Sequence, residues 1–204
     1  MNTENYSKIL VEDIHSTIVA TVGEDGRPVT RAIDMMLWDK DGVYFLTAKG
    51  KAFYAQLMEQ KFIALSAVKD KKAISLRGTV QNIGNNKLDE IFEKNAYMQK
   101  IYPGDTRSAL EVFQLCDAEG DYFDISDPEH VFRDRIVIAK AVEQKKTYGG
   151  YYITDACTGC GICKEACPQK CINISAVPAV INQNHCLHCG QCFSVCPENA
   201  VMNR

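Results

Sequence analysis

The stretch CTGCGICKEACP occupies residues 157–168 and places four cysteines at the spacing C-x2-C-x2-C-x3-C-P. The same spacing returns in CLHCGQCFSVCP at residues 186–197, so every cysteine of the first run recurs 29 positions later. Only two of the ten cysteines, Cys116 and Cys171, lie outside the two runs. This internal duplication predicts a small C-terminal domain built from two equivalent halves.

The spacing is typical of cubane iron–sulfur clusters, in which three close thiolates hold one cluster and the fourth cysteine ligates the other. We therefore expect a [4Fe–4S] cluster on Cys157, Cys160, Cys163 and Cys196, and a second on Cys186, Cys189, Cys192 and Cys167. Gly161 and Gly190 fall where the backbone comes close to each cluster. Structural zinc is the alternative, but a third close cysteine and a trailing proline fit it poorly.

Residues 149–204 resemble the two-cluster bacterial ferredoxins at every ligand position. Alignment of the two halves sets Cys171 opposite Ala200, so we predict that Cys171 is a buried filler. His185 and His188 have no counterpart that could bind a metal in the first half, and we expect both in loops. The alternative for His188 is that it tunes the potential of its cluster by hydrogen bonding.

Length and composition indicate two domains: a first over residues 1–140 and the cluster domain over 149–204, joined by a linker at 141–148. A net charge of −3 with interspersed acids and bases does not favour a nucleic-acid partner. The start, MNTENYSKIL, lacks a signal-peptide pattern, and no apolar run is long enough to span a bilayer. We expect a cytoplasmic protein, in which cysteines serve as ligands rather than as disulfides.

The first 140 residues alternate with period two, as short antiparallel strands do. In STIVATV, for example, Ile18, Ala20 and Val22 alternate with Thr17, Val19 and Thr21. Strands are predicted at 16–22, 29–38, 43–48, 61–68, 73–83, 110–117 and 122–126. Helices are predicted at 51–60 and from an N-cap at Asn86 to Pro103, and a turn is predicted at 118–121. This order predicts a mainly β fold, a small closed barrel, and Cys116 in its core.

The segments GRPVTRAIDMMLW, VYFLTAKGK, FIALSAV and SLRGTV resemble the split β-barrel flavoproteins that include pyridoxamine 5'-phosphate oxidase. The resemblance spans residues 8–126. It implies an FMN-binding split β-barrel, followed by the ferredoxin-like domain with its two clusters, and a homodimer with one FMN in each of two interface grooves. By position, it implies that Arg31, Thr47, Lys49 and Lys51 hold the FMN phosphate.

Arg31 has support of its own, because it shares a strand face with Val29 and Ile33, where a bound anion would balance its charge. The alternatives are that Arg31 pairs with Asp34, and that Lys49 and Lys51 are solvated. Two departures from the oxidase pattern argue against oxidase activity. Its second basic residue corresponds to Met36, and the hydroxyl-rich run is shortened to AKGK. A deazaflavin or a haem is an alternative to FMN.

We expect an FMN-dependent reductase of an anaerobic cytoplasm that exchanges electrons with a ferredoxin-like partner through its clusters. An electron carrier without a substrate and an iron–sulfur redox sensor are the alternatives. The substrate and the catalytic residue are unassigned, with Tyr54, Tyr97 and Asp34 as candidate proton donors. The acidic run at 117–129 suggests either a docking surface for a basic partner or a solvated hairpin.

Overall fold

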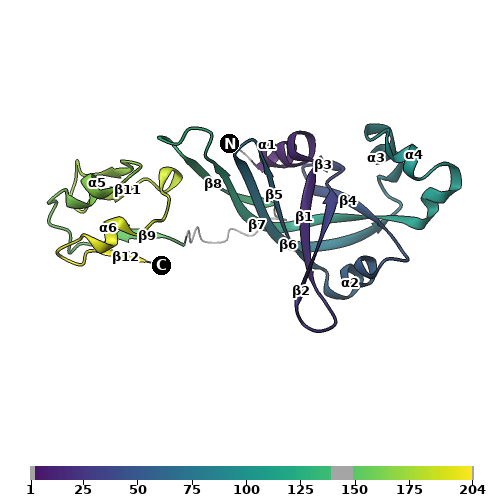
Figure 1. The fold of residues 1–204 in the computed structure, drawn as a ribbon, viewed down its shortest axis with the longest axis horizontal. Coiled ribbons are helices and arrows are strands. Elements are labelled where there is room, and N and C mark those ends of the chain that lie inside the picture. Colours follow the sequence, from purple (N-terminus) through teal and green to yellow (C-terminus); the bar gives the residue numbers. More distant parts are fainter. Residues whose placement is uncertain (1–2, 139–148, 204) are drawn as a thin grey trace. The chain divides into compact units, whose positions relative to one another are not determined.

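The computed structural model describes residues 3–138 and 149–203 and divides into two compact units (Figure 1). Unit 1 comprises Met1–Tyr122 and Arg135–Val142, and unit 2 comprises Phe123–Asp134 and Glu143–Arg204. The expected linker at 141–148 lies outside the described residues. The segment Phe123–Asp134, which we expected in the first domain, belongs to the unit that contains the cysteine runs.

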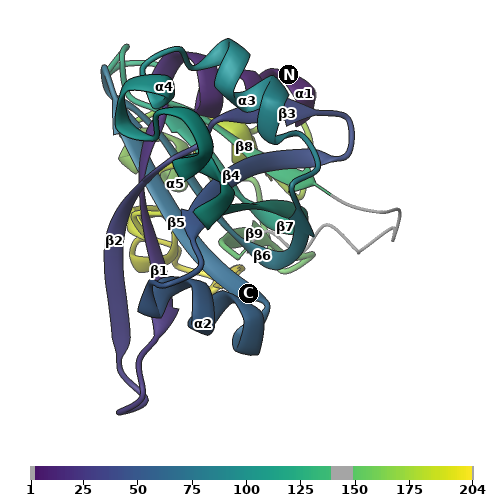
Figure 2. The ribbon, with the colours of Figure 1, turned by 90° about the vertical axis from the view of Figure 1, so that its right-hand side faces the viewer.

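Unit 1 is built on one eight-stranded sheet in the order β2-β1-β5-β6-β7-β4-β3, with β8 paired to β7. The strands are β1 (Ser16–Val22), β2 (Pro28–Asp34), β3 (Leu37–Asp39), β4 (Gly42–Ala48), β5 (Phe62–Lys69), β6 (Lys72–Gly84), β7 (Leu110–Asp124) and β8 (Phe132–Ile138). The two ends of this order, β2 and β3, are joined by Met35 and Met36. Their amides donate to His15 O and Tyr44 O, both at 2.8 Å, so the sheet curls into a barrel (Figure 2).

Short helices cover this barrel. They are α1 (Thr3–Lys8), a π-helix (Ile9–Ile14), α2 (Ala52–Gln60), α3 (Leu88–Lys94), α4 (Met98–Ile101) and a 3-10 helix (Gly104–Ala109). Figure 2 shows α2 on the opposite side of the barrel from α1, α3 and α4. Leu46 and Val112 pack with Ile91 and Met98 in a buried cluster that fixes α3 and α4 on the sheet. No helix within the described residues is both long and apolar enough to cross a membrane.

The predicted single helix from Asn86 is wrong in two respects. Lys87, in a left-handed conformation, precedes α3, and Asn86 provides no side-chain cap. The helix also breaks after Lys94, where the side chain of Asn95 donates to the carbonyls of Ile91 and Met36 at 2.9 and 3.0 Å. A side chain that takes up these carbonyls competes with continuation of the helix.

The predicted turn at 118–121 is also wrong, because β7 runs without interruption through Gly120. A Cβ on Gly120 would lie 1.8 Å from Ser75 O, and one on Gly78 would lie 2.1 Å from Asp117 O. Both glycines therefore permit a close crossing of β6 and β7 and do not form a turn. The predicted strand at 29–38 is divided into β2 and β3 by the bend at Met35 and Met36.

The outer surface of β1 and β5 is unusually apolar for a solvated sheet face. In β1, Thr17, Val19 and Thr21 point into the core, and the side chains between them point outward. Ile18 is 52% exposed and Val68, on β5, is 70% exposed. The register places Ile18 beside Ser66 of β5 and Ala20 beside Ala64, so the outward-facing residues of the two strands form one surface. The apolar outer face comprises Ile18, Ala20, Val22, Phe62, Ala64 and Val68.

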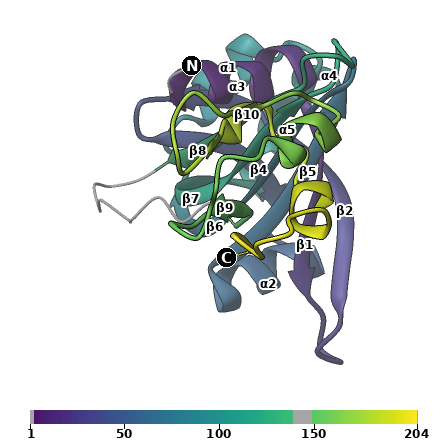
Figure 3. The same cartoon turned by 90° about the vertical axis from the view of Figure 1, so that its left-hand side faces the viewer.

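Unit 2 repeats one design twice, as the duplication predicts. Helix α5 (Ile162–Ala166) follows Gly161 and helix α6 (Gln191–Ser194) follows Gly190, and both glycines have φ of 80°. Two short antiparallel pairs complete the unit: β9 (Tyr151–Ile153) with β12 (Val201–Asn203), and β10 (Ile172–Asn173) with β11 (Val180–Ile181). Figure 3 labels β9 and β10, one strand of each pair. A 3-10 helix (Gln183–His185) precedes the second cysteine run.

Candidate cofactor sites

Unit 2 contains two cysteine-lined cavities, and the first lies beside the first cysteine run. Three of its cysteines come from the first run and the fourth from the second: Cys157, Cys160, Cys163 and Cys196. Apolar side chains such as Ile153, Ile174 and Val201 form much of the remaining wall. The loop therefore wraps one face of the cavity, while the last cysteine of the other run reaches it from the opposite half of the domain.

The second cavity mirrors the first. Its cysteines are Cys186, Cys189 and Cys192 from the second run and Cys167 from the first, with Cys171 as an additional neighbour. Among residues 3–138 and 149–203, no group of three His, Cys, Asp or Glu side chains lies close enough to hold a single metal ion. Thiols set apart around a cavity fit a cubane cluster better than one zinc ion.

Backbone amides and burial shape the chemistry of these thiols. The amides of His188 and Ala200 donate to the sulfurs of Cys186 and Cys196, both at 3.3 Å. Burial raises the pKa of Cys192 to about 11 in the absence of a bound cation, so this thiol needs a positively charged partner to ionise. A cluster iron supplies that charge, and the amide donors stabilise the sulfurs of a bound cluster. The residues therefore fit [4Fe–4S] clusters.

Cys171, which we predicted to be a buried filler, is only partly buried. Its sulfur lies 3.6 Å from that of Cys167. The neighbouring thiol of Cys186, burial and the contact with Cys167 raise the pKa of Cys171 far above its usual range. Cys116 meets its prediction, because it is buried in β7 at 9% exposure.

The expected loop residues His185 and His188 differ in their surroundings. His185 ends the 3-10 helix, and its Nδ1 contacts the carbonyl of Val131 at 2.9 Å. His188 lies in the cysteine loop with φ of 55°. Its backbone amide contacts Cys186, so any tuning of the cluster by the His188 side chain stays a prediction.

Arg31 occupies a site of a different kind in unit 1. Its guanidinium donates to Thr21 Oγ1 at 2.8 Å and to Gln56 Oε1 at 2.9 Å, and it lies 4.3 Å above the ring of Phe53. Burial lowers the pKa of Arg31. In the part of the chain that the structure describes, no carboxylate pairs with Arg31, and the expected alternative partner Asp34 is engaged elsewhere. A partly buried cation with neutral partners fits a bound anion.

The other expected phosphate contacts lie around the turn from β4 into α2. Thr47 is 2% exposed, and its hydroxyl has no hydrogen-bond partner among the described residues. Lys51 is exposed and immediately precedes α2, whose second residue, Phe53, packs against Arg31. Lys49 lies 4.0 Å from Glu111 in an ion pair, so part of its charge is already balanced. Arg31, Thr47 and Lys51 thus fit a phosphate better than Lys49 does.

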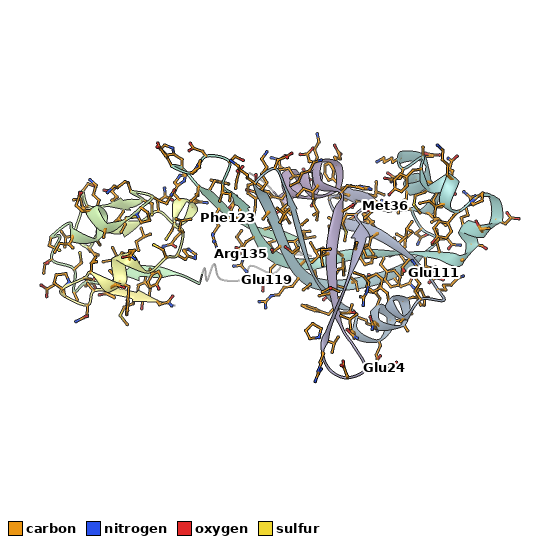
Figure 4. All side chains as sticks on the ribbon, in the orientation of Figure 1. Glu24, Met36, Glu111, Glu119, Phe123 and Arg135 are labelled. Carbon is orange, nitrogen blue, oxygen red and sulfur yellow. The ribbon has the colours of Figure 1, made fainter. Side chains whose placement is uncertain are left out.

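Met36 takes no part in this site. It is 7% exposed and belongs to the buried cluster under α3 and α4 (Figure 4). Tyr54, a candidate proton donor, donates to Glu111 Oε2 at 2.6 Å, and Asn82 donates to the same oxygen at 2.7 Å. These hydrogen bonds, from Asn82 and then Tyr54, lower the pKa of Glu111. The hydrogen bond to Glu111 raises the pKa of Tyr54.

Tyr97 and Asp34, the other two candidates, meet at a second polar group. Tyr97 donates to Asp34 Oδ2 at 2.9 Å, and His15 Nε2 lies 3.0 Å from the same hydroxyl. Burial and then Asp34 raise the pKa of Tyr97. The sequence did not point to His15, which has φ of 69° and ψ of −63° at the end of the π-helix. Strained backbone of this kind is concentrated at functional sites.

The acidic run at 117–129 is not one free surface. In unit 1, Glu119 accepts hydrogen bonds from Arg77 at 2.9 Å and from Arg135 at 2.6 Å (Figure 4). In unit 2, Asp127 pairs with His130 at 3.0 Å. Internal pairing of these acids agrees better with the hairpin alternative than with a docking surface.

Solved structures share the fold of unit 1. A NimC/NimA family protein from Clostridium acetobutylicum is 15% identical, with a TM-score of 0.55 over 66% of this chain and 92% of that chain. A second protein from the same organism, related to general stress protein 26 of the pyridoxinephosphate oxidase family, is 20% identical, with a TM-score of 0.51 over 66% and 93%. A heme binding protein from Mycobacterium smegmatis is 11% identical, with a TM-score of 0.50 over 69% and 62%. No curated protein matches the sequence significantly.

Two sequence families match the chain. Residues 156–201 match the 4Fe-4S dicluster domain, and residues 4–119 match the pyridoxamine 5'-phosphate oxidase family. The split β-barrel expected from the sequence is thereby confirmed. A flavin-binding fold joined to a 4Fe-4S domain indicates a redox protein that transfers electrons. The chain belongs to the pyridoxamine 5'-phosphate oxidase family and carries a C-terminal 4Fe-4S dicluster domain.

Proposed function

We propose that this protein is an FMN-dependent reductase that receives electrons from a ferredoxin-like donor through two [4Fe–4S] clusters. The observation that carries the proposal is the crossed arrangement of two cysteine quartets around two cavities, in the same chain as a flavin-binding fold. A bound flavin takes up one or two electrons whereas a cluster carries one, so this pairing converts single-electron supply into a two-electron reduction.

The barrel residues bind and orient the cofactor in this proposal. Arg31 supplies the positive charge for the phosphate, since only neutral side chains hold its guanidinium within the described residues. The unpaired hydroxyl of Thr47 donates a further hydrogen bond. Lys51 adds a second cation at the start of α2. Oxidation of pyridoxamine phosphate is not proposed, because the position of the second basic residue is the buried Met36.

The functional unit proposed is a homodimer formed through the apolar outer face of β1 and β5. An exposed apolar sheet face is a common mark of a protein–protein interface. A second copy of the chain is the partner that the family resemblance implies, with the FMN groove at the boundary between copies. Burial of Ile18 and Val68 would remove the apolar surface that the single chain leaves in water.

Tyr97, Asp34 and His15 are the proposed source of a proton for the substrate. Tyr97 is 39% exposed, so a substrate atom can reach its hydroxyl. The hydrogen bonds to Asp34 and His15 fix that hydroxyl and connect it to two further titratable groups. Tyr97→Phe should slow substrate turnover while leaving reduction of the bound flavin by ferredoxin unchanged. Equal turnover by the variant and the wild type would remove Tyr97 from this role.

The proposed setting is an anaerobic cytoplasm. Cys160 and Cys189, one ligand of each cluster, are exposed. Exposure of this kind brings a redox partner close to the clusters, but it also leaves them open to oxygen. A reaction that consumes oxygen is therefore not proposed for a protein with these exposed clusters.

The test is anaerobic stopped-flow mixing of the full-length holoprotein with a reduced bacterial ferredoxin while the flavin absorbance is followed. Cys160→Ser should slow flavin reduction by at least about 100-fold if electrons enter through the clusters. Cys116→Ala is the matched control, because Cys116 is a cysteine of the barrel core and lies in neither cavity. Reduction at the wild-type rate in Cys160→Ser would contradict the proposal. Fast flavin reduction with no turnover of any substrate would favour an electron carrier.

A further inference from the structure

The end of the β7–β8 hairpin belongs to the compact unit that holds the cysteine runs. This segment, Phe123–Asp134, joins unit 2 although β7 and β8 otherwise belong to unit 1. Val131 N donates to Gln169 Oε1, and Gln169 Nε2 donates to Pro128 O, both at 3.0 Å. Two contacts from the same side chain to this segment fix the hairpin end against the first cysteine run.

A second pair of contacts fixes the hairpin end at the start of the other run. Asn184 Nδ2 donates to Arg133 O at 2.8 Å, and His185 Nδ1 contacts Val131 O at 2.9 Å. The ring of His185 also meets Phe132 edge-on at 6.3 Å. The hairpin end contributes four residues to these contacts, and all four lie outside the segment 149–204 that resembles a ferredoxin: Pro128, Val131, Phe132 and Arg133.

All four hydrogen bonds lie beside ligands of the same proposed cluster. Gln169 is two residues after Cys167, and His185 immediately precedes Cys186. Cys167 and Cys186 line the second cavity. The first cavity is lined by four different cysteines: Cys157, Cys160, Cys163 and Cys196. The hairpin end therefore makes the surroundings of the two cavities different, although the duplicated sequence would make them alike.

Arg133 is the charged residue at this point. Its Nε is buried and has no hydrogen-bond partner within the described residues, and its guanidinium lies 4.9 Å from the ring of Phe123. Its backbone carbonyl accepts the hydrogen bond from Asn184, two residues before Cys186, which places Arg133 beside the second cavity. No carboxylate among residues 3–138 and 149–203 pairs with Arg133, so no ion pair balances its charge there.

We propose that Arg133 raises the reduction potential of the cluster held by Cys186, Cys189, Cys192 and Cys167 and makes it the more easily reduced of the two. Reduction adds one negative charge to a cluster, and a nearby partly buried cation stabilises that charge more than the oxidised state. The second cluster is then the electron acceptor within the pair. The inference rests on the clusters of the proposed function, but not on the flavin or on a substrate.

The experiment is a redox titration of the anaerobic, full-length holoprotein followed by electron paramagnetic resonance. Arg133→Gln should reduce the equilibrium constant for reduction of the second cluster by about tenfold. For a one-electron couple this lowers its reduction potential by ~59 mV. The potential of the other cluster should not change. Arg133→Lys should keep most of the wild-type value, because it retains the positive charge. Arg77→Gln, the same substitution on the outer surface of β6, should change neither potential.

The iron and sulfide contents of each variant distinguish a loss of clusters from a change in the potential of intact clusters. Full cluster content with unchanged potentials in Arg133→Gln would overturn the inference and leave the proposed function intact. A fall of both potentials by the same amount would also overturn it, because the effect would then be unspecific. Gln169→Ala gives a second test, since it removes two contacts of the hairpin end but keeps Arg133. We expect a smaller decrease of the same potential, and an increase would contradict the account.

Discussion

The buried cores of the two units consist of different kinds of side chain. In unit 1, aliphatic and aromatic side chains of β4, β7, α3 and α4 pack directly on one another, as Leu46, Ile91 and Val112 do. In unit 2, four of the eight residues of the buried cluster are cysteines: Cys163, Cys167, Cys186 and Cys192. A core made half of cofactor ligands is complete only with its cofactors, whereas an apolar core forms without them.

Removal of iron should therefore have the largest effect and should act on one unit only. Anaerobic treatment with a strong iron chelator should abolish hydrogen-exchange protection in residues 149–203, because metal binding and folding are coupled there. Strands β1, β5 and β6 should keep their protection. Loss of protection in these barrel strands would show that the two units do not fold separately, and retained protection in 149–203 would show that its core does not need the clusters.

A glycine substitution should destabilise the barrel of unit 1 without loss of iron from unit 2. Gly120→Ala places a Cβ 1.8 Å from the backbone oxygen of Ser75, so β6 and β7 must separate. We expect a loss of about 3 kcal/mol in the unfolding free energy of the barrel, measured by chemical denaturation. Gly50→Ala is the control, since its Cβ would meet no atom within 4 Å. An equal stability of the two variants would contradict the close crossing.

Arg31 should be needed for binding of the flavin but not for retention of iron in the cluster domain. Arg31→Ala removes the cation that Thr21 and Gln56 hold, and we expect about 2 kcal/mol weaker binding of FMN, or about thirtyfold. Fluorescence titration of the flavin-free protein measures this loss. Arg27→Ala, which removes an exposed arginine paired with Asp25, should bind FMN as the wild type does. Identical affinities of both variants would remove Arg31 from the phosphate site.

The smallest expected effect is a pH dependence of barrel stability. Hydrogen bonds from Asn82 and Tyr54 hold the pKa of Glu111 below its unfolded value of 4.5. Stability from this carboxylate is therefore complete above that value and is lost as the pH falls through the lower folded pKa. Glu111→Gln should reduce the loss on acidification by up to about 1 kcal/mol. Denaturation curves at neutral and acidic pH test this, and an unchanged acid response would contradict the assignment.

The sequence alone was sufficient where the chemistry is local. The cysteine spacing predicted which residues would surround each cavity, because the ligand pattern of a cubane cluster leaves few arrangements. The alternation of apolar residues predicted most strands, but not which face of β1 would be buried. That face carries Thr17 and Thr21, and Ile18 points outward.

Long-range contacts were not predictable in this way. Gly120 resembles a turn residue in the sequence, and only its crossing with Ser75 explains it. His15 joins Tyr97 across 82 positions, and Val131 contacts His185 across 54. No periodic pattern marks such pairs. The role of the hairpin end beside the second cavity therefore became apparent only in the folded chain.

The most direct test of the central claim is a cofactor count on anaerobically purified protein. Absorption spectroscopy with iron, sulfide and released-flavin analysis should give about eight iron, about eight sulfide and one FMN per chain, the content of two cubane clusters and one flavin site. Zinc without sulfide would contradict the cluster assignment. Full iron and sulfide without any flavin would contradict the reductase and leave a sensor or a simple electron carrier.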